Sequence, residues 1–145
     1  MYKRILLPTD GSDASRRAIQ YGVDFARSIG ADVVAMTATR VFHTLTADSE
    51  MLEQTPEQYA EASRARAQRL LDEVMAVARD AGVSCTGVQV VSDEPYEAII
   101  DTARQHMCDL IVMASHGQRG IKGLLLGSET QKVLVHSAIP VVVHR

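Results

Sequence analysis

The stretch Ile111-Val-Met-Ala-Ser-His-Gly-Gln-Arg-Gly-Ile-Lys-Gly-Leu-Leu-Leu-Gly-Ser-Glu-Thr130 contains the signals of a strand, a loop and a helix start. Its apolar beginning predicts a buried strand, and the glycines at positions 117, 120, 123 and 127 predict a loop. Ser128 with Gln131 three residues later predicts a capping box. Such an arrangement can form a phosphate cradle, because backbone N–H groups approach an anion there. The same glycines could instead serve only tight turns.

Outside this stretch, apolar strands alternate with amphipathic helices. Strands are predicted at residues 5–7, 32–39, 84–91, 109–114 and 140–144, and helices at residues 13–28, 56–81, 93–106 and 129–136. The first helix is predicted to bury Ala18, Tyr21, Val23, Phe25, Ala26 and Ile29. Residues 41–54 sustain no period, which predicts a mobile loop. Short buried strands separated by helices predict an α/β fold with a parallel sheet covered on both faces.

Composition narrows the class of protein. A length of 145 residues with no shift in composition predicts one domain over residues 1–145. The net charge of −3 argues against a nucleic-acid or acidic-membrane partner. Neither a signal peptide nor an apolar run of membrane-spanning length is found, so we expect a cytoplasmic protein. Cys85 and Cys108 have no metal-ligand spacing and are expected to be buried, reduced thiols.

Two loops are placed to form a ligand site. In parallel sheets of this kind, ligands bind beyond the carboxyl ends of the strands, where the strand order reverses. Asp10 follows the first strand, so it would face the glycine loop if the first and fourth strands are neighbours. An aspartate there could accept hydrogen bonds from a nucleoside, or it could be an ordinary turn residue. Neither the dinucleotide fingerprint GxGxxG nor the P-loop GxxxxGK[ST] is present after the first strand.

Four motifs, in order, resemble those of the universal stress protein family over nearly the whole chain. They are Leu7-Pro-Thr-Asp-Gly-Ser12, Asp109-Leu-Ile-Val-Met113, Ser115-His-Gly117 and Leu124-Leu-Leu-Gly-Ser128. The nucleotide-binding pattern of that family, G-x2-G-x9-G-[S/T], falls on Ala114, Gly117, Gly127 and Ser128. This chain therefore departs from the pattern at its first position, where alanine replaces glycine.

The resemblance implies a Rossmann-like fold of five parallel strands in the order 3-2-1-4-5, with helices on both faces. It also implies ATP as the ligand, with or without Mg²⁺, in a regulator of the stress response. Carried over residue by residue, the adenosine would contact Pro8, Thr9, Asp10, the backbone of Ala38, Met113 and Ala114. The phosphates would contact Gly117, Gly127, Ser128 and Glu129. A homodimer through the last strand, Val141–Val143, and an unidentified regulatory protein partner are implied as well.

Two alternatives stay open at this point. One is a dimeric stress protein that binds partners without nucleotide, because one branch of the family lacks the glycine pattern. The other is a weak ATP hydrolase of the adenine-nucleotide alpha-hydrolase fold group. Such enzymes usually carry SGGxDS or HIGH, whereas here the loop reads Thr9-Asp-Gly-Ser-Asp-Ala-Ser15 and His116 precedes Gly-Gln-Arg. No catalytic or metal-binding residues are assigned. Ala114 is predicted to stay strand-like, and ATP to bind about tenfold more weakly than with glycine.

Overall fold

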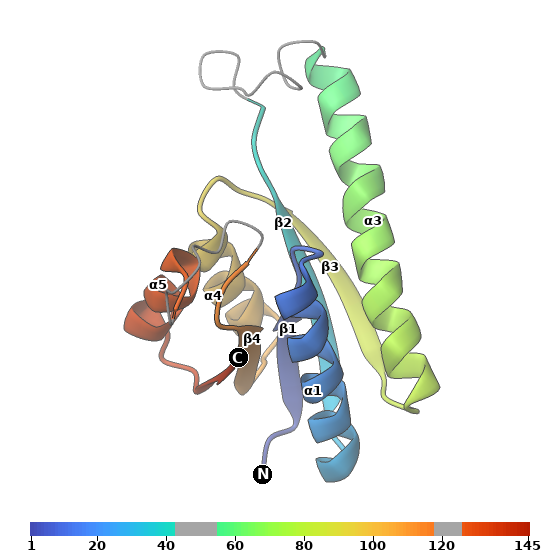
Figure 1. The fold of residues 1–145 in the computed structure, drawn as a ribbon, viewed down its shortest axis with the longest axis vertical. Helices are drawn as coiled ribbons and strands as arrows, with labels where there is room; N and C mark the ends of the chain where they lie inside the picture. Colours follow the sequence, from blue (N-terminus) through green and yellow to red (C-terminus); the bar gives the residue numbers. More distant parts are fainter. Residues whose placement is uncertain (43–54, 118–125) are drawn as a thin grey trace.

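The computed structural model describes residues 1–42, 55–117 and 126–145, and it folds them into five strands and four helices (Figure 1). In chain order, the elements are β1 (Arg4–Pro8), α1 (Asp13–Ile29), β2 (Asp32–Thr39), α3 (Pro56–Asp80), β3 (Cys85–Val91), α4 (Pro95–Gln105), β4 (Leu110–Ala114), α5 (Ser128–His136) and β5 (Val141–His144). Most of the loop predicted at residues 41–54 lies outside the described residues. None of the helices in the described ranges is long and apolar enough to cross a membrane.

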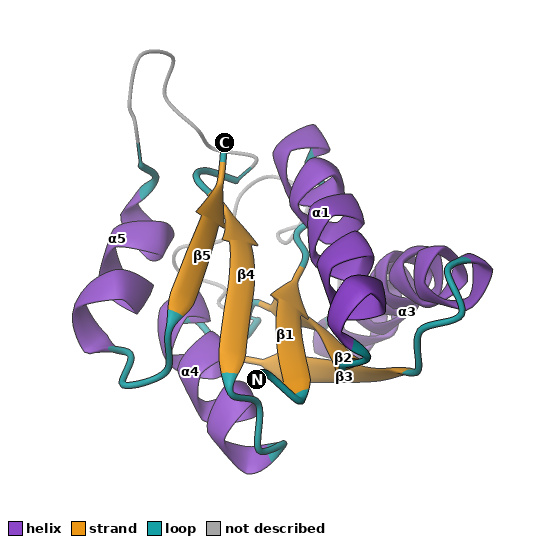
Figure 2. Ribbon diagram, turned by 90° about the horizontal axis from the view of Figure 1, so that it is seen from below, coloured by secondary structure: helices purple, strands orange, loops and turns teal. Residues whose placement is uncertain are grey.

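The strands form one parallel sheet in the order β3-β2-β1-β4-β5. Helices α1 and α3 cover one face of this sheet, and α4 and α5 cover the other (Figure 2). The predicted fold class, strand order and two-sided helical cover are therefore confirmed. Because β1 lies between β2 and β4, the chain order reverses at β1, and the loops after β1 and β4 leave the same edge of the sheet.

Alternation along the strands divides the core into two layers. Ile5 and Leu7 of β1 face α1 and α3, whereas Leu6 faces α4 and α5, and none of the three has exposed surface. Each such fully buried side chain contributes roughly 1.5–3 kcal/mol to the stability of the fold. Helix α1 packs so closely on the sheet that a Cβ atom at Gly22 would overlap Cδ2 of Leu7.

The buried face of α1 matches the predicted one in part, because Ala18, Val23 and Ala26 are buried as predicted. Ala14, Ile19 and Gly22 are buried, whereas Tyr21 and Ile29, predicted to point inward, are 44% and 38% exposed. Tyr21 instead lies over the end of β5, with its ring centroid 5.2 Å from that of His144. Small residues let the helix approach the sheet closely, and Tyr21 and Ile29 lie at the flanks of this contact.

The helix starts follow the sequence signals in α3 but not in α5. Thr55 and Gln58 form the predicted capping box of α3. The capping box predicted for Ser128 and Gln131 is wrong, because α5 already begins at Ser128 with Gly127 as its N-cap and no side-chain cap. The side chain of Gln131 donates to the carbonyl oxygen of Leu126 at 3.0 Å instead. Other helix and strand ends differ from the predicted bounds by one or two residues.

Three helices end in the same left-handed turn, and one of them does so without glycine. Gly30 after α1 and Gly82 after α3 have φ angles of 71° and 72°, and Met107 after α4 has a φ of 56°. At α4 the N–H of Met107 donates to Arg104 and that of Cys108 to Ala103, which is a Schellman motif. The Met107 residue is 77% exposed, so its side chain gains little from burial.

We expect Met107→Gly to raise the free energy of unfolding by about 1 kcal/mol, because a left-handed backbone strains every side chain but glycine. Urea unfolding followed by circular dichroism would measure the change. Gly82→Met is the matched control, since it introduces the same strain after α3 and should destabilise the protein by a similar amount. A less stable Met107→Gly variant would contradict this account.

Candidate functional site

The loop after β1 is fixed by short-range hydrogen bonds at the carboxyl edge of the sheet. The N–H of Thr9 donates to the carbonyl oxygen of Met36 in β2 at 2.9 Å, and its hydroxyl accepts the N–H of Gly11 at 3.2 Å. Gly11 has a φ of 80°, which suits glycine at this turn. Ser12 caps α1 by accepting the N–H of Ser15. This loop therefore presents Asp10 at the sheet edge in a defined position.

The carboxylate of Asp10 has the turn role that the sequence left open, and it also lies beside the glycine loop. Its Oδ1 atom accepts the N–H of Ser12 at 2.9 Å, which is a turn-forming bond. Its Oδ2 atom faces the start of the glycine loop, where a Cβ atom at Gly117 would overlap it. The structure thus brings the loops after β1 and β4 into contact, as their positions in the chain predict. The Asp10 residue is exposed at the surface beside this contact.

The base of the glycine loop is closed by hydrogen bonds between its two arms. The N–H of Gly127 donates to the carbonyl oxygen of Ser115 at 2.6 Å, and the hydroxyl of Thr130 donates to that of Ala114 at 2.9 Å. A Cβ atom at Gly127 would lie 3.2 Å from Cα of His116, which is a tight approach. The N–H of Gly127 is thus used within the loop, and this glycine serves loop closure. Residues 118–125 lie outside the described part of the chain.

Ala114 lies in β4 and keeps the predicted strand conformation. The backbone there is not left-handed, since Met107 is the only residue other than glycine with positive φ in the described ranges. The methyl group of Ala114 packs in a small buried cluster with Ala14 and Ala18 of α1. The methyl group of Ala114 is therefore used in packing on α1.

The other predicted residues surround the same edge. Pro8 ends β1 beside Met36, and Ala38 lies two residues farther along β2. Ala38 packs on the core layer that contains Met113, the last residue before Ala114 in β4. Ser128 and Glu129 form the first turn of α5, where backbone N–H groups lack partners within the helix.

The Glu129 side chain does not point to the glycine loop but links α5 to α4. Its Oε2 atom accepts the N–H of Tyr96 in the first turn of α4 at 2.9 Å, and its Oε1 atom lies 3.4 Å from Nζ of Lys132. Nζ of Lys132 in turn lies 5.5 Å from the centroid of the Tyr96 ring. Only the backbone of Glu129 is therefore placed to serve a ligand at the glycine loop.

Sequence reasoning missed the polar residues that hold the two loops. Ser15 and Thr130 are 4% and 3% exposed, and their hydroxyls bond to the carbonyl oxygens of Ser12 and Ala114. Their only signal in the sequence is a hydroxyl residue in the first turn of a helix that follows a strand. His116 is held at the loop base, where its Nδ1 atom lies 3.1 Å from Oγ of Ser115.

The cysteines lie away from this edge. Neither forms a disulfide, Cys108 is buried and Cys85 is partly buried. Burial raises the pKa of the Cys108 thiol to about 11, although the nearby Arg4 acts to lower it. This thiol is therefore protonated at neutral pH and is a poor nucleophile.

The sequence profile of the Universal stress protein family matches residues 1–145, the whole chain. The chain belongs to the universal stress protein family. Its curated relatives in this family include universal stress protein MJ0531 of Methanocaldococcus jannaschii, which is 31% identical over 145 residues, with 99% of this chain and 82% of the relative covered.

Solved structures of the family are similar over nearly the whole chain. The structure of protein MJ0577, also from Methanocaldococcus jannaschii, has a TM-score of 0.83 at 26% identity and covers 99% of this chain and 95% of its own. A universal stress protein solved in complex with cAMP has a TM-score of 0.73 at 26% identity, with 99% and 97% of the two chains covered. This family member thus shares its arrangement of strands and helices with its relatives.

Proposed function

We propose that this universal stress protein binds ATP beyond the carboxyl ends of β1 and β4 and acts as a nucleotide-dependent regulator of the stress response. The observation that carries the proposal is the contact between the Asp10 carboxylate and Gly117, which joins an acceptor for a nucleoside to a glycine loop. An exposed carboxylate accepts hydrogen bonds from ribose hydroxyls, while glycine N–H groups and a helix N-terminus attract phosphate. The family member in complex with cAMP supports an adenine nucleotide as the class of ligand.

The proposed roles follow the positions of the residues around the sheet edge. Pro8, Thr9 and Asp10 would line the adenosine, with the backbone of Ala38 at the adenine and Met113 and Ala114 near the ribose. Gly117 would let the loop approach the phosphates, and the N–H groups of Ser128 and Glu129 would bind them. Gly127 would keep the loop closed through its bond to Ser115. Mg²⁺, where it accompanies ATP, would be bound through the phosphates.

A regulatory output can follow from the connections of α5. Phosphate bound at the first turn of α5 would act on a helix whose Glu129 carboxylate holds the first turn of α4. The ligand would thereby influence the outer surface formed by α4 and α5, which lies on one face of the sheet (Figure 2). The regulatory protein partner would bind to this surface. We assign no catalytic residue, and ATP turnover has no part in the proposal.

Nucleotide that copurifies with the protein tests this proposal. The protein, purified without added nucleotide, would be denatured in acid and the released nucleotide identified by chromatography and mass spectrometry. We expect ATP, in an amount that falls in Asp10→Ala. The control is Asp13→Ala, which removes a neighbouring exposed carboxylate at the start of α1. If no nucleotide is released and added ATP does not bind, the nucleotide-free alternative is correct.

We expect Ala114→Gly to change the affinity for ATP by less than about tenfold. The methyl group packs on Ala14 and Ala18 of α1, so its removal gives the ligand no new space. The variant should instead lose about 1 kcal/mol of stability, because glycine in a strand costs backbone entropy and leaves a small cavity. Calorimetric titration with ATP and urea unfolding measure the two effects. Tight binding that appears only in Ala114→Gly would show that the parent protein has lost its nucleotide site.

A further inference from the structure

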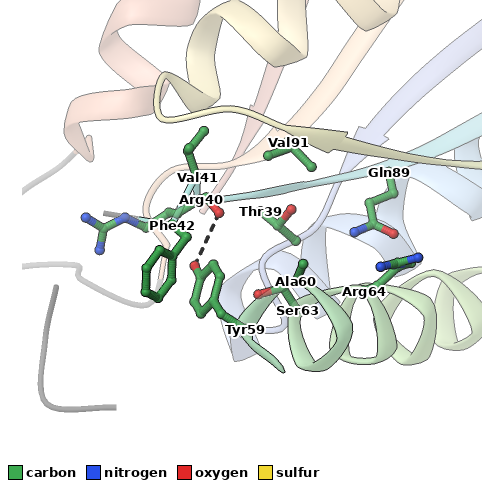
Figure 3. A pocket seen from close by; sticks show the side chains of 10 residues that line it. All are labelled: Thr39, Arg40, Val41, Phe42, Tyr59, Ala60, Ser63, Arg64, Gln89 and Val91. Atoms are coloured by element: carbon green, nitrogen blue, oxygen red, sulfur yellow. Dashed lines mark hydrogen bonds between the residues drawn. The ribbon is translucent and has the colours of Figure 1, made fainter. Parts of the chain in front are cut away.

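A pocket lies on the α3 face of the sheet. It has a volume of about 370 Å³ and is lined by Thr39, Arg40, Val41, Phe42, Tyr59, Ala60, Ser63, Arg64, Gln89 and Val91 (Figure 3). None of these residues belongs to the proposed nucleotide site. Ala38, which does, packs on the opposite core layer because successive strand residues point to opposite faces.

The lining is formed by one helix face and one sheet face. Tyr59, Ala60, Ser63 and Arg64 are spaced by three and four residues, so they share one side of α3. Gln89 and Val91 alternate on the same face of β3, and Val91 pairs with Thr39 of β2. The regular elements α3, β2 and β3 thus fix most of the pocket wall, as a preformed ligand site requires.

One end of the pocket is aromatic and is held in place. The rings of Phe42 and Tyr59 have centroids 5.4 Å apart at an angle of 57°, and the Tyr59 hydroxyl donates to the carbonyl oxygen of Arg40 at 3.2 Å. Val91, which is 63% exposed, adds apolar surface. A flat apolar group would contact these side chains favourably, because aromatic rings prefer offset or edge-to-face partners.

The opposite end carries a cation and an amide. Figure 3 shows Arg64 and Gln89 at this end, with Thr39, Ala60 and Ser63 between them and the aromatic pair, while the guanidinium of Arg40 points away. Arg64 forms no ion pair with a carboxylate in the part of the chain that the structure describes. A guanidinium matches a carboxylate through two parallel hydrogen bonds.

We propose that this pocket binds a small planar monocarboxylate whose apolar or aromatic body lies against Phe42 and Tyr59 and whose carboxylate pairs with Arg64. A single inward-facing guanidinium suits one negative charge, and it would leave most of the charge of a nucleoside triphosphate unpaired. The hydroxyls of Thr39 and Ser63 lie along the middle of the pocket, where they can bond to a polar substituent of the ligand. The pocket is thus a ligand site separate from the nucleotide site.

Titration with trans-cinnamate, an aromatic monocarboxylate, tests this inference, and its neutral amide cinnamamide is the matched ligand. In ¹⁵N-labelled protein we expect saturable shifts at the amides of Ser63, Arg64 and Gln89, and none at Asp10 or Gly117. Arg64→Gln should weaken the binding of cinnamate at least about tenfold, or about 1.4 kcal/mol. The affinity for cinnamamide should not change. Arg66→Gln is the control, because two residues along a helix it faces another direction.

The outcomes separate this inference from the proposed nucleotide function. Absence of saturable shifts, shifts confined to Asp10 and Gly117, or equal cinnamate affinity in Arg64→Gln and Arg66→Gln would each overturn it. Binding of ATP, measured on the same samples, should be equal in Arg64→Gln and the parent protein. A failure of cinnamate binding therefore leaves the ATP result intact, and a failure of ATP binding leaves the cinnamate result intact.

Discussion

Gly117→Ala is expected to weaken ATP binding by about tenfold to a hundredfold, because overpacking of this kind costs about 1–3 kcal/mol. The added methyl group would overlap Oδ2 of Asp10 and force the carboxylate out of its position. The Oδ1 atom is bonded to the N–H of Ser12, so the carboxylate cannot turn away without losing that bond. Isothermal titration calorimetry with ATP measures the loss.

A double-mutant cycle identifies the cause of that loss. Asp10→Ala removes the overlapping oxygen, so in its presence Gly117→Ala should cost little more than Asp10→Ala alone. Gly87→Ala is a control for adding a methyl group elsewhere, because Gly87 lies in β3, away from the glycine loop. Its added Cβ atom would lie 3.3 Å from Sδ of Met75. If Gly117→Ala leaves ATP affinity unchanged, or if the two losses simply add, Asp10 and Gly117 do not form one site.

Val143→Pro is expected to convert the homodimer that the family resemblance implies to monomers without unfolding the protein. β5 pairs with β4 at one edge of the sheet. The carbonyl oxygen of Pro140 accepts the N–H of Ile111 in β4, and that of His144 accepts the N–H of Ser115, which directly follows β4. By alternation Val142 also faces β4 and Val143 faces outward. Proline at residue 143 removes an outward N–H that a second copy of β5 would need, and edge strands tolerate proline.

Val142→Pro is the contrasting variant. It removes an N–H that bonds to β4, so it should lower the free energy of unfolding by about 1–3 kcal/mol. A lysine at residue 142 would be a poorer test, because the Val142 side chain packs on the α1 face of the core. Sedimentation velocity on both variants and the parent gives the oligomeric state. A monomeric parent, or a dimeric Val143→Pro, would contradict dimerisation through β5.

The fold was predictable because each element carries its own local signal. The apolar runs, the Thr55 and Gln58 capping box and the glycines after α1 and α3 mark the strands and helix ends along the chain. The order 3-2-1-4-5 came from the resemblance to the family, since alternating strands and helices fit several parallel sheets.

What the sequence did not reveal depends on contacts between distant segments. Tyr21 was placed inward on its spacing, but the tight approach of Gly22 to Leu7 moved the buried face of α1. Gly127 was expected to donate to phosphate, yet its N–H closes the loop on Ser115. Ala114 was considered for its contact with the adenosine, and the sequence did not show that its methyl group packs on alanines of α1. In each case a residue far away in the chain decides the role.

Calorimetric titration of the parent protein with ATP and with AMP tests the central claim most directly. The glycine loop and the first turn of α5 would bind the outer phosphates, which AMP lacks. ATP should therefore bind at least about tenfold more tightly than AMP, a difference of about 1.4 kcal/mol in binding free energy. Equal affinities for the two nucleotides, or no binding of either, would contradict the claim that the Asp10 and Gly117 loops form an ATP site.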